Sequence, residues 1–183
     1  MKKIIRITTT SLLVLMIVGL SLFWNRIFGY PTLDQAVQSN WKTPVKIVNM
    51  DQENQLVLYL DETQYVFAAY EQKRGRFHVN ADSESGWTAS TDHGPAFLVV
   101  AEPKNNSGNF MWGALYSDIS IAKFQIKYIN GETHDIKAIN NTFIVRMPIA
   151  FQNESELSLM ETFDNIHAID ANHQVIQSWK PER

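Results

Sequence analysis

Cysteine is absent from this sequence of 183 residues, and glycine and proline are scarce, with eight and six residues. Without cysteine there is no thiol nucleophile, no thiolate metal site and no lipoprotein processing site. The glycines are scattered, so no phosphate-binding loop of the P-loop or dinucleotide type is present. A G-x-S-x-G nucleophile motif is missing as well. The commonest sequence signatures of catalysis are therefore absent, and thiol chemistry is excluded.

Charge is divided unevenly along the chain. Of 16 basic and 19 acidic residues, the first 28 positions hold four basic ones, Lys2, Lys3, Arg6 and Arg26, and no acid. Residues 29–183 therefore carry 12 basic and 19 acidic side chains, a net charge of −7. Nucleic-acid binding depends on neutralising phosphates with Lys and Arg, so an acidic body predicts no nucleic-acid partner.

An uncharged segment separates the basic residues of the N-terminal region. Residues 7–24 form a continuous stretch without a charge. As a helix they would extend about 27 Å, close to the roughly 30 Å of a bilayer's hydrocarbon core. Trp24, at the end of this stretch, and Tyr30, after it, lie where interfacial aromatic residues are usual. We therefore expect residues 1–28 to form a cytoplasmic tip and a transmembrane anchor, with residues 7–24 in contact with the membrane.

A cleaved secretory signal is the alternative interpretation of the same segment. Such signals end at small residues, whereas this apolar run ends in Leu22, Phe23 and Trp24, which favours an uncleaved anchor. Three basic residues before the segment and one after it predict a cytoplasmic N-terminus. The expected location is the cell membrane, crossed once, with the C-terminal domain outside.

The body, residues 29–183, is predicted to be mostly β, either sandwich-like or α+β, with antiparallel sheets and one short N-terminal helix. Thr32 and Gln35 match a capping box, and Leu33, Ala36 and Val37 follow at helical spacing, which predicts a helix over 33–39. Short β-rich runs separated by turn residues come next. The predicted strands are 45–50, 55–60, 64–70, 76–80, 96–101, 122–128, 133–139, 143–147, 165–171 and 174–179.

Turn residues set the expected connections between these strands. Asn130-Gly131 is a strong signal for a two-residue hairpin of type I′, in which both residues have positive φ. Asn140-Asn141 predicts a second turn soon after it. The stretch 103–108 is rich in linker residues, so the body is either one domain or two halves divided there.

One polar loop supplies the candidate ligand residues. His78, Asp82, Glu84, Trp87 and His93 combine titratable groups with an aromatic ring that can grip a sugar or a peptide. A solvated loop with Trp87 packed in the core is the alternative. None of the histidines shows the spacing typical of a metal site. We therefore predict no catalytic residue, no metal site and no cofactor.

Several short segments resemble a group of small uncharacterised single-pass extracytoplasmic proteins of Bacillus-type Gram-positive bacteria. The resemblance covers most of the body, and it implies a location and a β-rich ectodomain while transferring no catalytic residue. The segments that carry it are 31–36, 39–41, 112–113, 118–119, 124–126, 130–131, 168–170 and 175–176.

Two functions follow from these observations. The first is a membrane-anchored extracytoplasmic binding or interaction module of unknown ligand, acting with another envelope protein. The alternative is a cell-envelope enzyme or metal-binding domain that uses the loop residues between 78 and 93. The first depends on the anchor and on the lack of catalytic motifs, and the second on the loop alone.

Overall fold

The computed structural model describes residues 16, 18–19, 23–61, 64–80, 87–90, 96–101, 108–152 and 162–180. These residues are mostly β, as the sequence predicts, and all strand pairs are antiparallel. The strands are β1 (Val45–Asp51), β2 (Leu56–Asp61), β3 (Gln64–Lys73), β4 (Arg76–Asn80), β5 (Trp87–Ser90), β6 (Ala96–Ala101), β7 (Phe110–Leu115), β8 (Ile121–Tyr128), β9 (Thr133–Lys137), β10 (Thr142–Arg146), β11 (Phe163–Asp170) and β12 (Val175–Trp179).

The predicted N-terminal helix is confirmed as α2 (Leu33–Gln38). Thr32 is its N-cap, and the Thr32 hydroxyl accepts a hydrogen bond from the Gln35 backbone N–H at 3.3 Å. The helix ends one residue earlier than predicted, because Ser39 serves as its C-cap. Its buried residues, Leu33, Ala36 and Val37, form the face that lies against the neighbouring sheet.

Sheet A contains β1, β2, β3 and β4 in that order, with β5 added beside β3. One edge of β3 pairs with β2 over residues 64–69. The other edge is divided, since residues 64–67 pair with β5 and residues 69–73 pair with β4. The strand β3 is therefore the centre of the sheet, and the chain from β4 to β5 starts and ends on the same edge of it.

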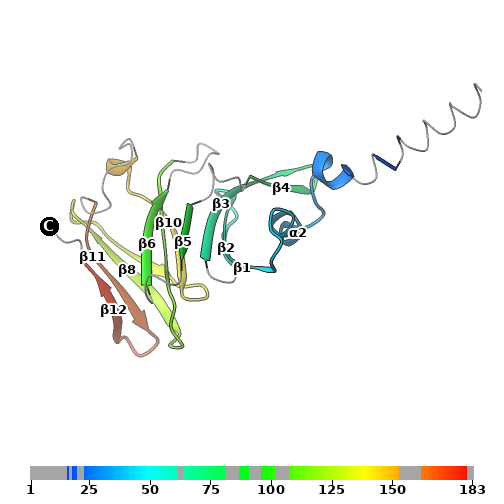
Figure 1. Ribbon diagram of the computed structural model, residues 1–183. Coiled ribbons are helices and arrows are strands. Elements are labelled where there is room, and N and C mark those ends of the chain that lie inside the picture. Colours follow the sequence, from blue (N-terminus) through cyan, green and yellow to red (C-terminus); the bar gives the residue numbers. More distant parts are fainter. Residues whose placement is uncertain are drawn as a thin grey trace, which may run out of the picture.

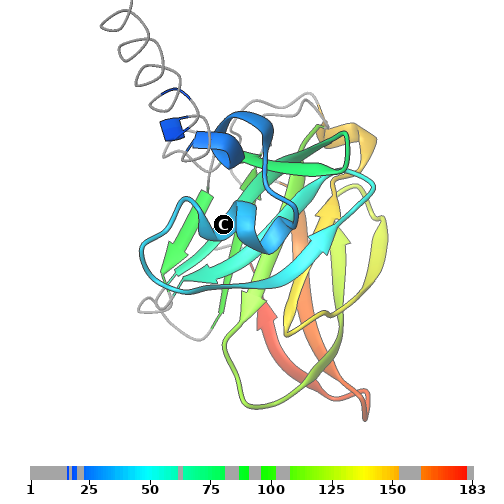
Figure 2. The ribbon, with the colours of Figure 1, turned by 90° about the vertical axis from the view of Figure 1, so that its right-hand side faces the viewer.

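Two further sheets complete the body. Sheet B has the order β10-β7-β6, and sheet C has the order β12-β11-β8-β9. Figure 1 shows sheet C on the left, sheet B in the middle and sheet A next to α2 on the right. Figure 2, turned by 90°, shows α2 in front of the sheets. The described part of the body is thus a stack of one α-helix and three sheets, with a short 3-10 helix (Ile149–Phe151) after β10.

Strand β7 lies in the middle of this stack, and all six of its residues are buried. Successive side chains of a strand point to opposite faces, so Phe110, Trp112 and Ala114 face sheet A while Met111 and Leu115 face sheet C. Trp112 stacks on Phe67 of sheet A, with ring centroids 5.9 Å apart. Two hydrophobic cores therefore share a single strand.

Sheet C has one face in water, as the alternation of residues 122–128 predicts. Phe124, Ile126 and Tyr128 of β8 are fully buried against sheet B. On the opposite face, Lys123 pairs with Asp135 of β9 at 2.5 Å, and Lys127 pairs with Asp164 of β11 at 2.9 Å. The pattern of this strand was readable because only one of its faces packs on the core.

The prediction of a type I′ turn at Asn130-Gly131 is wrong. Of these two residues only Gly131 has positive φ, and its N–H donates to the carbonyl of Tyr128 at 3.0 Å. The hairpin therefore closes as a longer turn with a single left-handed residue. Two positive φ values occur instead at Asn140-Asn141, which was predicted as a turn, and at Arg74-Gly75 between β3 and β4.

Two expectations fall on parts of the chain outside these residues. Of the expected membrane segment 7–24, only positions 16, 18–19 and 23–24 are described. Among the described residues no helix is both long and apolar enough to cross a bilayer. The suggested division at 103–108 falls between β6 and β7, which pair with each other, and residues 102–107 are not described. The membrane segment and the division into halves stay predictions.

Candidate functional site

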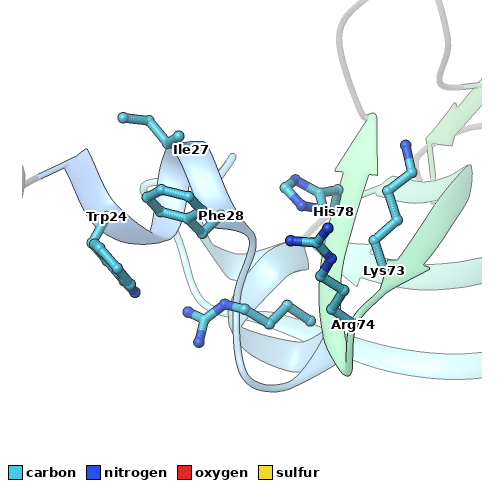
Figure 3. A pocket seen from close by; sticks show the side chains of 7 residues that line it. Trp24, Ile27, Phe28, Lys73, Arg74 and His78 are labelled. Carbon is cyan, nitrogen blue, oxygen red and sulfur yellow. The ribbon is translucent and has the colours of Figure 1, made fainter.

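A hollow of about 530 Å³ lies where helical residues 23–28 meet the hairpin formed by β3 and β4. Figure 3 shows Trp24, Ile27 and Phe28 on one side, with His78 and the hairpin residues on the other. We call it the basic–aromatic hollow, because one wall is apolar and the other carries cations. Its lining residues are Trp24, Ile27, Phe28, Lys73, Arg74, Arg76 and His78.

The apolar wall comes from helical residues 23–28. Trp24 and Phe28 lie one turn apart, which brings their ring centroids to 4.3 Å. Both are about half exposed, at 49% and 46%, and Ile27 is exposed at 57%. Gly29 ends the helix with a positive φ, the left-handed conformation that favours glycine after a helix. The chain then turns toward β4.

The basic wall comes from the hairpin. Arg74 and Gly75 both have positive φ, as a two-residue type I′ turn requires, and both are exposed. Lys73 forms an ion pair with Glu71 at 2.5 Å. The hydrogen bond from Lys73 to Glu71 and the charge of Lys73 lower the pKa of Glu71, and His78 lowers it by a smaller amount. Arg74 makes no ion pair with any residue that the structure describes.

Direct contacts join the two walls. Arg76 donates from Nε to the carbonyl oxygen of Gly29 and from Nη2 to Oδ1 of Asn25, both at 2.8 Å. The backbones of Tyr30 and Phe77 exchange two hydrogen bonds of 2.8 Å. Helical residues 23–28 are thereby fixed to the edge of sheet A, and the hollow has a defined geometry.

Only part of the predicted ligand loop lies among the described residues. His78 lies on β4 opposite Glu71, and Trp87 lies on β5 opposite Phe67, so both belong to strands along the same edge of β3. Asp82, Glu84 and His93 lie outside the described residues. Among the residues that are described, no three side chains of His, Asp or Glu gather to hold a metal ion. The alternative of an enzyme or metal-binding domain stays a prediction.

Of the predicted ligand residues that the structure describes, His78 lines the hollow. The cations were missed as site residues, since the predicted strand 64–70 left Lys73 and Arg74 in an unassigned connection and Arg76 was predicted only as the start of the strand 76–80. A signal was present, since Arg74-Gly75 lies between two β-rich runs at the spacing of a hairpin. The sequence did not predict that these cations lie beside residues 23–28, because that position depends on a contact between Arg76 and Gly29, which are 47 residues apart in the sequence.

A second hollow, of about 380 Å³, is open to solvent near the connection from β7 to β8. Tyr116 lines it and is exposed. Tyr65, which also lines it, is buried, and this burial raises the pKa of Tyr65, with a smaller effect from Tyr116. The amides in its wall are engaged within the fold. Asn140 donates to the carbonyl of Val48, and Asn141 donates to the carbonyls of Ser117 and Ile119. These asparagines therefore fix the turns that form this hollow.

Comparison with known proteins gives one partial similarity. No family model matches the chain, and no solved structure matches it. Phosphatidylethanolamine N-methyltransferase of the yeast Lachancea thermotolerans is 26% identical over 150 residues, a match that covers 74% of this chain. The chain spans only 16% of that protein's length. The similarity is therefore to a segment of a much longer protein.

Proposed function

We propose that this chain is a membrane-anchored extracytoplasmic interaction module. Residues 7–24 cross the membrane once, the N-terminus is cytoplasmic, and the β-rich body works at the outer surface with a partner of the cell envelope. The proposal combines the charge pattern of the N-terminal region with the contacts that hold helical residues 23–28 on the body.

One observation carries the proposal. Phe23, Trp24, Ile27 and Phe28 are all large, apolar and about half exposed, and they lie at the end of the uncharged segment and directly after it. A contiguous exposed apolar surface of this kind marks a contact with lipid or with another protein. Aromatic residues at the end of a membrane segment occupy the headgroup region. A lipid environment accounts for these exposed side chains and for the uncharged segment together.

The partial similarity is compatible with a location at a membrane and supports no catalytic activity for this chain. The yeast protein acts, by its name, on phosphatidylethanolamine, which is a membrane phospholipid. Because this chain corresponds to 16% of that protein, we propose no methyl transfer here. We also place no ligand in the hollow beside Tyr116, since the asparagine amides of its wall already have partners within the fold.

Extraction of membranes at alkaline pH tests the anchor. Wild-type protein should stay in the membrane pellet. A variant carrying Val14→Arg and Leu15→Arg should be extracted, because each arginine at the centre of a span disfavours insertion by about 2.5–3.5 kcal/mol. The matched control, Ile139→Arg with Val175→Arg, adds the same charges to exposed positions of the body and should stay in the pellet. Extraction of the wild type would contradict the proposal.

A further inference from the structure

We propose that the β3–β4 hairpin docks on the membrane surface and that the basic–aromatic hollow receives the headgroups of anionic phospholipids. This inference rests on the proposed anchor and extends it, because it assigns a partner to a particular part of the body. The hairpin would orient the body relative to the bilayer, while the anchor alone would only attach it.

The position of the hairpin is the first argument. Arg76 contacts Gly29 and Asn25, so the base of the hairpin lies beside the last turn of helical residues 23–28. Trp24 is four residues before Phe28, which corresponds to about 6 Å along a helix. If Trp24 and Phe28 lie at the headgroup level, the hollow lies at that level too. Figure 3 shows Arg74 and His78 extending from the hairpin near the helical residues Ile27 and Phe28.

The charge of the hairpin is the second argument. Lys73 and Glu71 form an ion pair and cancel each other, which leaves Arg74 and Arg76 as a local excess of two positive charges. Arg76 is engaged with Gly29 and Asn25, whereas Arg74 is exposed and pairs with no described acid. Residues 29–183 carry a net charge of −7, so an anionic surface repels most of the body and attracts this hairpin.

The apolar wall decides which anion fits. A free phosphate or an acidic peptide would satisfy the cations but would leave Trp24, Ile27 and Phe28 exposed to water. A phospholipid provides a phosphate for Arg74 and acyl chains for the apolar side chains in one molecule. Basic residues near an anionic membrane surface and aromatic residues at its headgroups are both usual. The arrangement therefore favours a lipid surface.

A spin label on the full-length chain tests the docking. The chain has no cysteine, so Gln72→Cys in the hairpin and Gln174→Cys at the turn before β12 can each carry one label at an exposed position. The protein is inserted into bilayer discs of phosphatidylcholine, with or without phosphatidylglycerol, that contain a nickel-chelating lipid. We expect nickel to relax the label at position 72 strongly when phosphatidylglycerol is present, and the label at position 174 weakly in both discs.

Charge variants measure how much Arg74 contributes to docking of the hairpin. Arg74→Gln should lower the ratio of docked to undocked hairpin about fivefold, the contribution expected for one cation near an anionic surface. The matched control Lys137→Gln removes one exposed lysine of sheet C and should change nothing. Equal relaxation at positions 72 and 174, or no effect of Arg74→Gln, would overturn the inference. Equally strong relaxation at position 72 in discs with and without phosphatidylglycerol would show that the anionic headgroup is not what the hairpin binds, and would overturn it as well.

The outcomes separate this inference from the proposed anchor. If the wild-type chain does not insert into the discs and is extracted from membranes at alkaline pH, the anchor fails. If it inserts and the label at position 72 stays far from the lipid, the anchor holds and only the docking fails.

Discussion

Gly29 lies directly against the imidazole of His78. A Cβ atom on Gly29 would come within 2.6 Å of His78 Nε2 and within 2.9 Å of the carbonyl oxygen of Phe77. This contact has no room for a side chain, and the positive φ of Gly29 disfavours one independently. The close approach lets the backbones of Tyr30 and Phe77 exchange their hydrogen bonds, so it holds residues 23–28 on sheet A.

Replacement of Gly29 by alanine should release this contact. The left-handed conformation costs an alanine about 1–2 kcal/mol, and the collision with His78 adds to it. We expect amide hydrogen exchange at Tyr30 and Phe77 to become at least tenfold faster, as measured by NMR. Gly75→Ala is the matched control, since Gly75 also has positive φ but nothing within 4 Å of its Cβ position. Equal effects of the two variants on these amides would contradict the contact.

A buried hydrogen bond joins sheets A and B. Asn49 of β1 donates from Nδ2 to the hydroxyl of Thr142 of β10 at 3.0 Å, and both side chains are buried. Thr142→Val keeps the shape but removes the acceptor, which leaves a buried amide donor without this partner and costs about 1–3 kcal/mol. Urea unfolding should show that loss of stability. Thr133→Val on the exposed face of β9 is the control, and an equal result for the two variants would refute the prediction.

The hydroxyl of Tyr128 is buried and has no hydrogen-bond partner among the described residues. Burial raises the pKa of Tyr128, with a smaller effect from Glu132. Because the hydroxyl loses its hydration without compensation, Tyr128→Phe should leave the free energy of unfolding unchanged or raise it by up to about 1 kcal/mol. Thermal unfolding measures the difference.

Tyr59 provides the matched comparison. Its hydroxyl accepts a hydrogen bond from Trp41 Nε1 at 3.0 Å, and burial raises its pKa to about 12. Tyr59→Phe removes an acceptor that is in use, so it should lower stability by about 1 kcal/mol. The prediction for Tyr128 fails if the two substitutions destabilise the protein equally.

On the solvent face of sheet C, the ionisation of Asp135 makes the free energy of unfolding depend on pH. Hydrogen bonds from Lys123 and Gln125 lower the pKa of Asp135. Since its pKa is lower in the folded state, Asp135 stabilises the protein fully above the ordinary pKa of an aspartate, and this contribution is lost as the pH falls through the folded pKa. The pair is exposed, so the contribution is well below 1 kcal/mol.

Urea unfolding of wild type and Asp135→Asn as a function of pH measures this contribution. The wild type should be slightly more stable at neutral pH, and the two stabilities should converge in acid. Glu53→Gln, which removes an exposed carboxylate, should give no comparable difference. A difference between wild type and Asp135→Asn that persists in acid would contradict the assignment to ionised Asp135.

Local patterns predicted most of the strands, and long-range contacts decided the rest. The strand β8 was readable because polar and apolar residues alternate where one face meets water. The strand β7 was missed although β2, which is also buried on both faces, was predicted, because Gly113 interrupts its apolar run and the run contains no Val, Ile or Thr. A buried strand of this kind has no periodic signal in the sequence.

The candidate site shows the same division. His78 was predicted from its residue type, but its neighbours Gly29 and Phe28 come from another part of the chain. The cations of the hairpin were counted within an acidic body, and their grouping beside the helix depends on the pairing of Tyr30 with Phe77. Composition therefore predicted the overall charge, while the fold determines where the positive charge lies.

The sidedness of the body tests the account most directly. Gln174→Cys places one thiol on the body, and Lys3→Cys places one before the expected membrane segment, in a chain that otherwise has none. In intact cells a membrane-impermeant maleimide should label full-length Gln174→Cys in the membrane fraction, and Lys3→Cys only after the membrane is permeabilised. Protection of Gln174→Cys in intact cells, or its labelling only on a shortened species in the medium, would contradict an outward-facing body on an uncleaved anchor.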